Sequence, residues 1–324
     1  MFTLSQLQEI ISKRINLLNY NKEPKGLYAP IEYTLDSGGK RIRPALVLAA
    51  CNLFSEDVEK AIPAALAFEV FHNFTLLHDD IMDNSPIRRN KPTVHNKWNS
   101  NTAILSGDAM MIEAYKLLSD LPAELLKKIL KLFNKTALQV CEGQQYDMEF
   151  EIKEIVSEED YLQMIKLKTS VLIAGALKAG AITGGANEKD AELLYKFGLN
   201  LGLAFQIQDD FLDTYGDTSV FGKKTGNDII TGKKTFLLIN ALQKADNRTS
   251  EKIKYLLKNN NISDKEKIKA VVKIYDILEI KKITENKIKH YHQKALSFLD
   301  EVSCEKKKKT EILNFASQLM KRKK

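Results

Sequence analysis

The chain has 324 residues, of which 44% are hydrophobic, so it is long enough to bury a sizeable core. Its 49 basic and 42 acidic residues give a formal charge of +7, which does not choose between nucleic acid, an anionic membrane and a phosphorylated small molecule as a partner. The three cysteines are too few and too scattered for a disulfide framework or a thiolate zinc site.

The N-terminus, Met1 to Arg14, has no uninterrupted apolar segment, so the sequence shows no signal peptide. No uncharged apolar stretch of the chain is long enough to span a bilayer. We therefore expect a cytoplasmic protein with no stable membrane insertion, for which contact with a membrane surface stays open.

Helical spacing of apolar residues dominates the chain. The first long run, Val58–Met82, carries its one proline near its start, where a helix tolerates it. Residues 84–97 contain two prolines, and residues 216–232 are rich in glycine and lysine, so both are predicted to be loops. Further helices are predicted over Thr102–Leu118, Pro122–Phe150, Ser157–Ala179, Lys189–Thr214, Lys234–Gln243, Glu251–Lys258, Lys265–Leu299 and Thr310–Lys321. No sustained alternation of apolar and polar residues indicates strands, so the sequence predicts an all-α protein with one domain over residues 1–324.

One carboxylate pattern occurs twice, at Asp79-Asp80-Ile81-Met82-Asp83 and at Asp209-Asp210-Phe211-Leu212-Asp213. Each copy lies at the polar end of an apolar helical run, where Asp79 and Asp83, or Asp209 and Asp213, share one helix face. Closely spaced carboxylates repel one another and resist burial, and magnesium binds one or two carboxylates together with phosphate oxygens. The pattern therefore predicts magnesium ions held around a diphosphate.

Basic residues supply a second kind of phosphate contact. The segment Gly38-Gly39-Lys40-Arg41-Ile42-Arg43-Pro44 places three cations in a glycine-led turn, which lets backbone and guanidinium groups approach phosphate oxygens. Arg88-Arg89 follows the first acidic motif, and Lys168-Thr169 lies in an otherwise apolar helical segment. Taken with two carboxylate motifs, these clusters indicate a site for two polyanions, one bound through metal and one bound directly.

These motifs resemble those of the trans-isoprenyl diphosphate synthases, the all-α prenyltransferases that elongate allylic diphosphates. The glycine-led basic turn, both acidic motifs, the Arg88-Arg89 pair, Lys168-Thr169 and the segment Gly143-Gln144-Gln145-Tyr146-Asp147 all occur in the family's order. The resemblance implies the isoprenoid synthase fold, a single-domain bundle of ten or more helices around a central active-site cavity. It also implies a homodimer, two or three Mg²⁺ ions and no nucleic-acid partner.

The resemblance assigns roles to individual residues. Isopentenyl diphosphate would be bound by Lys40, Arg43, His72 and Arg89. The metal ligands would be Asp79, Asp83 and Asp209, with Asp80 and Asp213 beside them. The residues that would contact the allylic diphosphate or its developing cation are Arg88, Lys168, Thr169, Gln206, Lys223 and Lys233. The predicted reaction is head-to-tail condensation of isopentenyl diphosphate with dimethylallyl, geranyl or farnesyl diphosphate.

Product length is predicted from the side chains that precede the first acidic motif. Thr75 and Phe71 lie four and eight residues before Asp79, beneath it on an ideal helix. Phe74 lies to one side of that stripe, so its role in limiting product length is implied by the resemblance and not by this geometry. Bulky residues here would stop elongation early, so we expect a C15 to C20 product rather than a longer polyprenyl chain.

Three other functions are compatible with parts of the sequence. A terpene cyclase shares the ionisation chemistry but needs no site for isopentenyl diphosphate, and it would carry a different second metal motif. A non-catalytic subunit of a synthase would be expected to have lost one acidic motif, and both are intact. A metal-dependent phosphohydrolase built on His78-Asp79 would need more histidine ligands than the five histidines of this chain provide.

Overall fold

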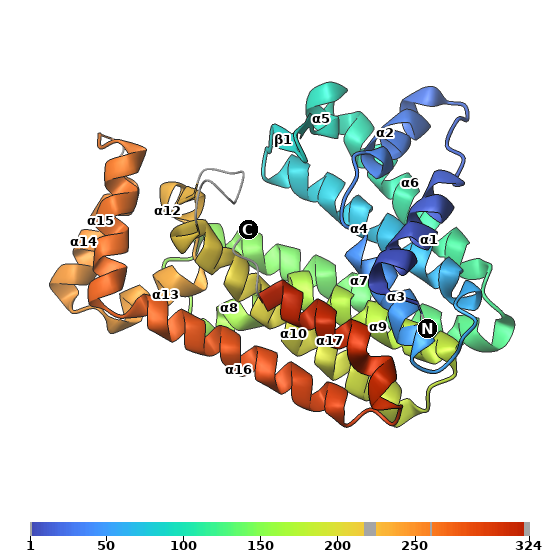
Figure 1. Ribbon diagram of the computed structural model, residues 1–324. Helices are drawn as coiled ribbons and strands as arrows, with labels where there is room; N and C mark the ends of the chain where they lie inside the picture. The colour runs from blue at the N-terminus through green and yellow to red at the C-terminus, as the bar shows by residue number, and fades with distance from the viewer. Residues whose placement is uncertain (1, 217–224, 260, 321–324) are drawn as a thin grey trace. The chain divides into compact units, whose positions relative to one another are not determined.

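The structure is a computed structural model that describes residues 2–216, 225–259 and 261–320 (Figure 1). Within these ranges the only strands are the two-residue pair β1 (Ile87–Arg88) and β2 (Lys91–Pro92), so the predicted all-α class is confirmed. The helices of the first half of the chain are α1 (Leu4–Asn16), α2 (Lys25–Asp36), α3 (Ile42–Asn52), α4 (Ile62–Met82), α5 (Val94–Lys97), α6 (Ser100–Ser119) and α7 (Ala123–Ile152). Those of the second half are α8 (Glu158–Ile165), α9 (Val171–Gly184), α10 (Glu188–Tyr215), α12 (Asn227–Thr231), α13 (Phe236–Lys244), α14 (Asn247–Lys258), α15 (Asp264–Ile277), α16 (Ile280–Asp300) and α17 (Lys306–Met320).

The described residues fall into two compact units, and each is treated by itself. Unit 1 comprises the described residues within 1–134, 175–195 and 302–312, and unit 2 comprises those within 135–174, 196–301 and 313–324. Four of the five boundaries between the units lie inside α7, α9, α10 and α17, and the fifth, at residues 301/302, follows the end of α16. The single domain expected over residues 1–324 stays a prediction.

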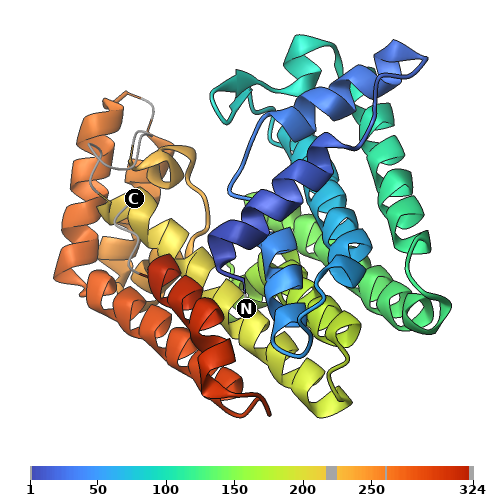
Figure 2. The same cartoon turned by 45° about the vertical axis from the view of Figure 1, so that its right-hand side comes forward.

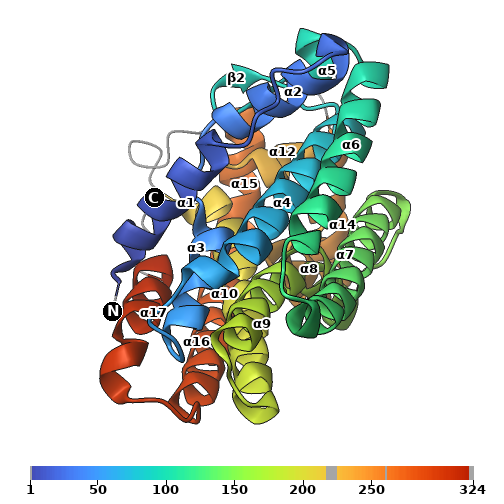
Figure 3. The same cartoon turned by 90° about the vertical axis from the view of Figure 1, so that its right-hand side faces the viewer.

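Unit 1 is built on α4, which is buried on nearly all sides. Its alanine, leucine and phenylalanine residues leave no polar face along most of its length, as is typical of a helix in the middle of a domain. The helices α6 and α3 run beside α4, and α1 covers α3 (Figure 3). Gly107 of α6 lets the two helices approach, because a Cβ atom there would overlap the His78 ring of α4. The helix expected over Val58–Met82 begins later, at Ile62, after a 3-10 turn at Glu59–Ala61, and Pro63 lies in its first turn.

Unit 2 is organised around the second half of α10. Leu203 and Ile207 of this helix share a core cluster with Phe236 of α13, Ile165 of α8 and, at its edge, residues of α16. Figure 2 shows α16 running along α10 in this unit. A second cluster joins α12, α13, α14 and α15. The apolar residues that the sequence places at helical spacing therefore fix the direction of α10, which carries the second acidic motif.

Several predicted boundaries differ from the structure. The loop expected over residues 216–232 contains α12, the helices α14 and α17 begin four residues before their predicted starts, and no bounds were predicted for α1 to α3. The helix expected over Lys265–Leu299 is divided into α15 and α16 at Glu279, whose φ of +56° is left-handed and ends the regular helix. The loop expected over residues 84–97 contains the β1–β2 hairpin and the short helix α5. None of the helices in the described ranges has an apolar stretch that would cross a bilayer.

Candidate active site

The glycine-led turn before α3 has a backbone that few side chains tolerate. Gly38 and Gly39 have φ values of +81° and +131°, and Arg41, at the N-cap of α3, has a φ of +47°. A Cβ atom at Gly39 would lie 2.8 Å from Nη2 of Arg89, so a larger residue would displace that guanidinium. The glycine at position 39 therefore provides both the conformation and the space for a close approach of Arg89.

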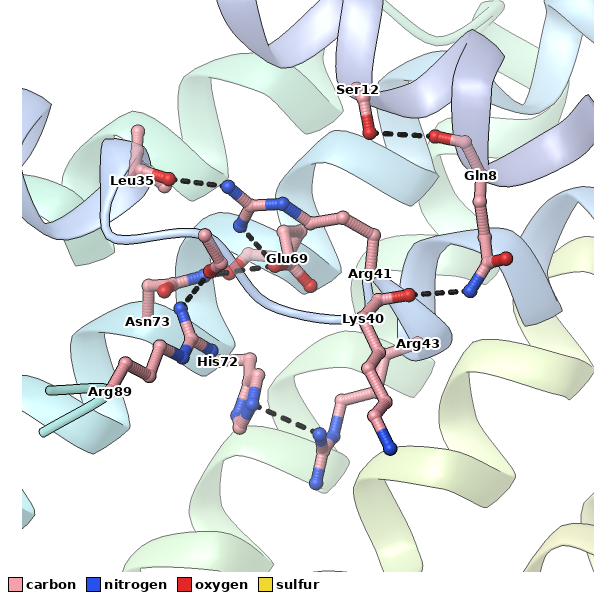
Figure 4. A network of polar contacts seen from close by, with 11 residues as sticks. Gln8, Ser12, Leu35, Lys40, Arg41, Arg43, Glu69, His72, Asn73 and Arg89 are labelled. Atoms are coloured by element: carbon pink, nitrogen blue, oxygen red, sulfur yellow. Dashed lines mark hydrogen bonds and ion pairs between the residues drawn. The ribbon is translucent and has the colours of Figure 1, made fainter. Parts of the chain in front are cut away.

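The cations of this turn point in different directions (Figure 4). Arg41 is directed into unit 1, where its guanidinium contacts Glu69 and the carbonyl of Leu35. Lys40 and Arg43 extend away from the guanidinium of Arg41 in Figure 4. The carbonyl of Lys40 accepts a hydrogen bond of 2.6 Å from Nε2 of Gln8 in α1, which holds the turn from the N-terminal side.

His72 lies in a strongly cationic environment. Its Nε2 is 2.9 Å from Nη1 of Arg43. Burial and the charges of Arg43, Arg89, Arg88 and Arg41 hold the pKa of His72 well below its usual value, so its imidazole is neutral at pH 7. Because a guanidinium only donates hydrogen bonds, Nε2 of His72 accepts and Nδ1 carries the proton.

Arg43 is the residue of this cluster that most clearly needs a further partner. Burial lowers its pKa to about 10, with the charge of Glu69 opposing that shift and the charge of Arg89 adding to it. Its Nε is buried and has no hydrogen-bond acceptor among the described residues. Since buried donors are nearly always paired, this atom indicates a site for an anion.

Arg89 occupies the turn of the β1–β2 hairpin. Arg88 pairs with Lys91 across the hairpin, so Arg89 and Asn90 form its two-residue loop, with φ values of +53° and +61°. Such turns need left-handed backbone at both positions and favour asparagine and glycine. An arginine here is strained, and strain of this kind is concentrated at functional sites. Nη1 of Arg89 donates to the carbonyl of Gly38, which connects the hairpin to the glycine-led turn.

The first acidic motif ends α4. Asp79 and Asp80 lie in its last turn, and Asp83 is its C-cap. Asp80 is buried at 5% exposure and is engaged by Arg88, whose Nε lies 2.7 Å from Oδ1 of Asp80. Nη2 of Arg88 lies 3.3 Å from Oδ2 of Asp79. Asp79 is half-buried and Asp83 is exposed, so the two outer carboxylates are the accessible ones.

The second acidic motif repeats this arrangement within unit 2. Asp210 is buried at 5% exposure, whereas Asp209 and Asp213 are half-buried. The hydroxyl of Tyr161 donates to Oδ2 of Asp210 at 2.5 Å, and the backbone N–H of Phe236 donates to the same oxygen at 3.3 Å. Burial raises the pKa of Asp210, and the charge of Lys233 and these hydrogen bonds oppose the shift. In both motifs the middle aspartate is held inside the unit.

Lys168 and Thr169 lie in a π-helical segment, Lys166–Ser170, between α8 and α9. Nζ of Lys168 is 2.6 Å from Oδ2 of Asp147 in α7. Thr169 donates to Oε1 of Gln206 at 3.2 Å, and Nε2 of Gln206 donates to Asp210 at 3.4 Å. The segment therefore joins the second acidic motif through side-chain hydrogen bonds, and π-helical insertions of this kind are frequent at functional sites.

Two glycines let neighbouring helices reach this segment. A Cβ atom at Gly143 of α7 would overlap the backbone nitrogen of Lys168 and lie 2.6 Å from the carbonyl carbon of Leu167. A Cβ atom at Gly202 of α10 would lie 2.7 Å from Cα of Ser170. The segment is thus enclosed between α7 and α10 at two positions where only glycine fits.

The chain after the second motif returns to it at α12. The backbone N–H of Asp228 donates to Oδ2 of Asp213 at 2.9 Å, and the N–H of Lys233 donates to the carbonyl of Asp228 at 2.9 Å. Burial raises the pKa of Asp228 to about 7, and the charges of Asp210 and Asp213 add to the shift. This concentration of negative charge favours a bound cation. Lys223, to which the resemblance also gave a role, lies outside the described residues.

Aromatic rings line α4 below the first motif. Phe71 lies 5.5 Å from Phe74 and 5.2 Å from Phe133 of α7, measured between ring centroids. Phe74 lies 4.7 Å from the His78 ring and is 8% exposed. Thr75 is half-buried, and its hydroxyl donates to the carbonyl of His72 at 2.8 Å. Phe71 is therefore core, whereas Phe74 retains some accessible surface.

The structure does not bring three or more Asp, Glu, His or Cys side chains together as a metal site within the described ranges. The donor set nevertheless fits magnesium, because each motif offers two accessible carboxylates and Mg²⁺ completes its shell with water and phosphate oxygens.

The residues of the candidate site that the sequence analysis did not predict are Glu69, Asn73, Phe133, Tyr161 and Asp228. Glu69 and Asn73 contact each other four residues apart on α4. The contacts of Glu69 with Arg41, of Tyr161 with Asp210 and of Asp228 with Asp213 join residues 28, 49 and 15 positions apart, so no local spacing pattern indicates them.

Comparison with known proteins assigns the chain to a family. A family model described as "Polyprenyl synthetase" matches residues 24–275. The chain belongs to the polyprenyl synthetase family. A geranylgeranyl diphosphate synthase of Methanosarcina mazei is 44% identical over 223 residues, which are 68% of this chain and 69% of that protein.

Solved structures of polyprenyl synthetases agree with this assignment. A crystal structure of a geranylgeranyl pyrophosphate synthase matches with a TM-score of 0.95 and 44% identity over 100% of both chains. A geranylgeranyl pyrophosphate synthase from Corynebacterium glutamicum, complexed with isoprenyl diphosphate and magnesium, matches with a TM-score of 0.87 and 26% identity over 99% of this chain and 100% of that one. The chain is therefore a prenyltransferase that belongs to the short-chain trans-prenyl synthase family and has the isoprenoid synthase fold.

Proposed function

We propose that this prenyltransferase condenses isopentenyl diphosphate head-to-tail with an allylic diphosphate, releasing diphosphate and a trans-prenyl diphosphate of 15 to 20 carbons. The observation that carries the proposal is the anion site of unit 1, where Nε of buried Arg43 lacks an acceptor among the described residues and four arginines surround neutral His72. A terpene cyclase has no use for such a site beside its metal motif.

Isopentenyl diphosphate is assigned to this cluster. Lys40, Arg43 and Arg89 provide the charge, and His72 holds the guanidinium of Arg43 in place. Fixed guanidinium groups bind phosphate oxygens through paired hydrogen bonds, and they need little rearrangement when the ligand arrives.

The allylic diphosphate is assigned to the acidic motifs and their neighbours. We propose that Asp79, Asp83, Asp209 and Asp213 hold two or three Mg²⁺ ions, which neutralise charge on the diphosphate when bound. Asp80 remains a predicted ligand, although its contact with Arg88 favours a supporting role. That both motifs serve one diphosphate rests on their duplication and on family membership. Direct contacts to the diphosphate or developing cation are proposed for Arg88, Lys168, Thr169, Gln206, Lys233 and Lys223.

The reaction proceeds by ionisation of the allylic carbon–oxygen bond, whose electron pair leaves with the diphosphate. Arg88 and the lysines stabilise this charge. The double bond of isopentenyl diphosphate attacks the allylic cation, and loss of a proton from the adjacent carbon restores a double bond. The departing diphosphate is the proposed base. Apolar side chains exclude water, which would otherwise capture the cation.

Phe74 is proposed to limit product length, together with Phe71 and Thr75. Phe74→Ala is expected to shift the product to longer chains, because removing the ring opens space below the first acidic motif. Chromatography of the dephosphorylated products measures this. Phe150→Ala is the matched control, since Phe150 is similarly buried at 5% exposure but packs in a core cluster of unit 2. An unchanged product distribution for Phe74→Ala would contradict the assignment.

We also propose that residues 1–324 form one domain and that two copies of the chain form a homodimer. Leu105 and Ile112 on α6 are 60% and 67% exposed, and Ile104 beside them is 46% exposed. Apolar side chains gathered on one exposed helix are typical of an interface. Sedimentation velocity of the purified chain tests this state, and a monomer at micromolar concentration would contradict it.

The proposed function is tested by incubating the protein with labelled isopentenyl diphosphate and each short allylic diphosphate, with and without Mg²⁺. We expect incorporation of label into C15 or C20 products, and its loss when EDTA is added and recovery when Mg²⁺ is restored. Full turnover in EDTA, or a cyclised hydrocarbon formed without isopentenyl diphosphate, would overturn the proposal.

A further inference from the structure

Glu69 is a buried carboxylate in α4 that the reaction described above does not use. Its side chain is only 3% exposed, and it lies beside the guanidinium of Arg41 (Figure 4). Burying a carboxylate costs desolvation free energy, and only close cationic or hydrogen-bonding partners offset that cost. The partners that Glu69 has therefore indicate what it does.

Those partners are a guanidinium and an amide. Oε1 of Glu69 lies 2.7 Å from Nη1 of Arg41, and Nδ2 of Asn73 donates to the same oxygen at 3.1 Å. Asn73 also donates to the backbone carbonyl of Glu69 at 2.8 Å, so it fixes the carboxylate within α4. The second branch of Arg41 donates to the carbonyl of Leu35 at the end of α2. Arg41 is thus fastened at both ends of its guanidinium.

Because Arg41 lies at the start of α3, its contacts with Glu69 and Leu35 also affect the positions of Lys40 and Arg43. Arg41 is the N-cap of α3 and has a left-handed backbone, so an unfavourable conformation is held in place by its side chain. Lys40 precedes it directly, and Arg43 lies in the first turn of the helix that it starts. Any movement of Arg41 therefore changes the aim of both cations.

The negative charge of Glu69 also stabilises the arginine cluster. Burial lowers the pKa of Arg43 and of Arg89, and the charge of Glu69 is the largest effect that raises the pKa of each. Several guanidinium groups would repel one another without a negative charge between them. The buried carboxylate of Glu69 offsets part of this repulsion beside Arg41, while Nε of Arg43 has no acceptor among the described residues.

We propose that Glu69 is a positioning residue of the isopentenyl diphosphate site: through Arg41 it fixes the glycine-led turn and the first turn of α3, and it thereby sets the aim of Lys40 and Arg43 without touching the substrate. The proposal rests on the proposed function of this cluster. It gives Arg41 a different task from Lys40 and Arg43, although all three lie in one basic motif.

Glu69→Gln tests the proposal because glutamine keeps the shape and an acceptor for Asn73 but removes the charge. We expect the KM for isopentenyl diphosphate to rise about 10- to 100-fold, as is typical when a charged hydrogen bond is lost, while the KM for the allylic diphosphate changes less than threefold. Glu69→Asp is expected to recover part of the loss. Glu192→Gln, which removes a half-exposed carboxylate paired with Lys178 in the same unit, is the control and is expected to change neither constant.

Arg41→Lys gives an independent test should Glu69→Gln fold poorly. Lysine keeps the positive charge but cannot contact Glu69 and Leu35 as a fork. The KM for isopentenyl diphosphate is expected to rise in this variant too, and the double variant should lose little more than the worse single one. Effects of the two substitutions that do not add in this way would show that Glu69 and Arg41 act together.

Three outcomes would overturn the proposal. A lower KM for isopentenyl diphosphate in Glu69→Gln would mean that the carboxylate only repels the substrate. A fall in the melting temperature with both KM values unchanged would mean a purely structural role, and an equal rise in both would mean general damage. Failure of the wild-type chain to incorporate isopentenyl diphosphate in the same assay would instead refute the proposed function.

Discussion

Replacing Asp79 or Asp209 by asparagine is expected to lower kcat by about 10²- to 10³-fold, the usual result of removing one group that stabilises developing charge. Both residues are half-buried at helix ends rather than held in the core. We therefore expect normal folding and a higher Mg²⁺ concentration for half-maximal activity. Steady-state kinetics over a magnesium titration, with circular dichroism as the check on folding, measure the effect.

The double variant Asp79→Asn/Asp209→Asn shows whether the two motifs act together. If they hold ions around one diphosphate, the double variant should lose little more activity than the worse single one, because groups that act as a unit are not additive. Asp120→Asn is the control, since Asp120 is exposed at the C-cap of α6. Losses that multiply fully would indicate two independent sites and would contradict the proposed function.

Gly143→Ala is expected to have the second largest effect. The new Cβ atom would overlap the backbone of Lys168, so α7 or the π-helical segment must move. Overpacking of this kind costs about 1–3 kcal/mol of stability. Since Lys168 and Thr169 are proposed to contact the allylic diphosphate, kcat/KM for that substrate should fall about tenfold or more, and the KM for isopentenyl diphosphate should change less.

Gly26→Ala provides the matched control for this prediction. Gly26 lies in the first turn of α2, and a Cβ atom there meets nothing within 4 Å. Alanine is favoured over glycine in a helix, so the free energy of unfolding should stay the same or rise slightly. Thermal unfolding and the two KM values are measured for both variants. Gly143→Ala with wild-type kinetics would show that the segment need not be held in this position.

The features predictable from sequence are those that repeat at a short spacing. Apolar periodicity indicated the all-α class and most helices, and the acidic motifs appeared because their carboxylates recur at four-residue spacing. The break at Glu279 was missed because the apolar pattern continues through it and no glycine or proline marks it. The hairpin at Arg89 was missed because its turn lacks the glycine that such turns usually carry.

Side-chain networks were the least predictable part of the candidate site. Tyr161 and Asp210 are 49 residues apart, and Arg41 and Glu69 are 28 residues apart. Neither pair belongs to one helix face, so no periodicity connects its members. Local spacing shows that two aspartates are neighbours, but it does not show which one is directed into the core. The division of each acidic motif into a buried middle residue and accessible outer residues needed the packed helices.

The left-handed turn at Arg89 has a consequence for the thermodynamics of binding. A long arginine side chain on a flexible loop would lose much rotational freedom when it grips a phosphate. Here the narrow hairpin and the Gly38 carbonyl already restrict that freedom in the folded chain. Most of the entropy loss therefore occurs during folding, before any ligand arrives, and the diphosphate meets a receptor that is already organised.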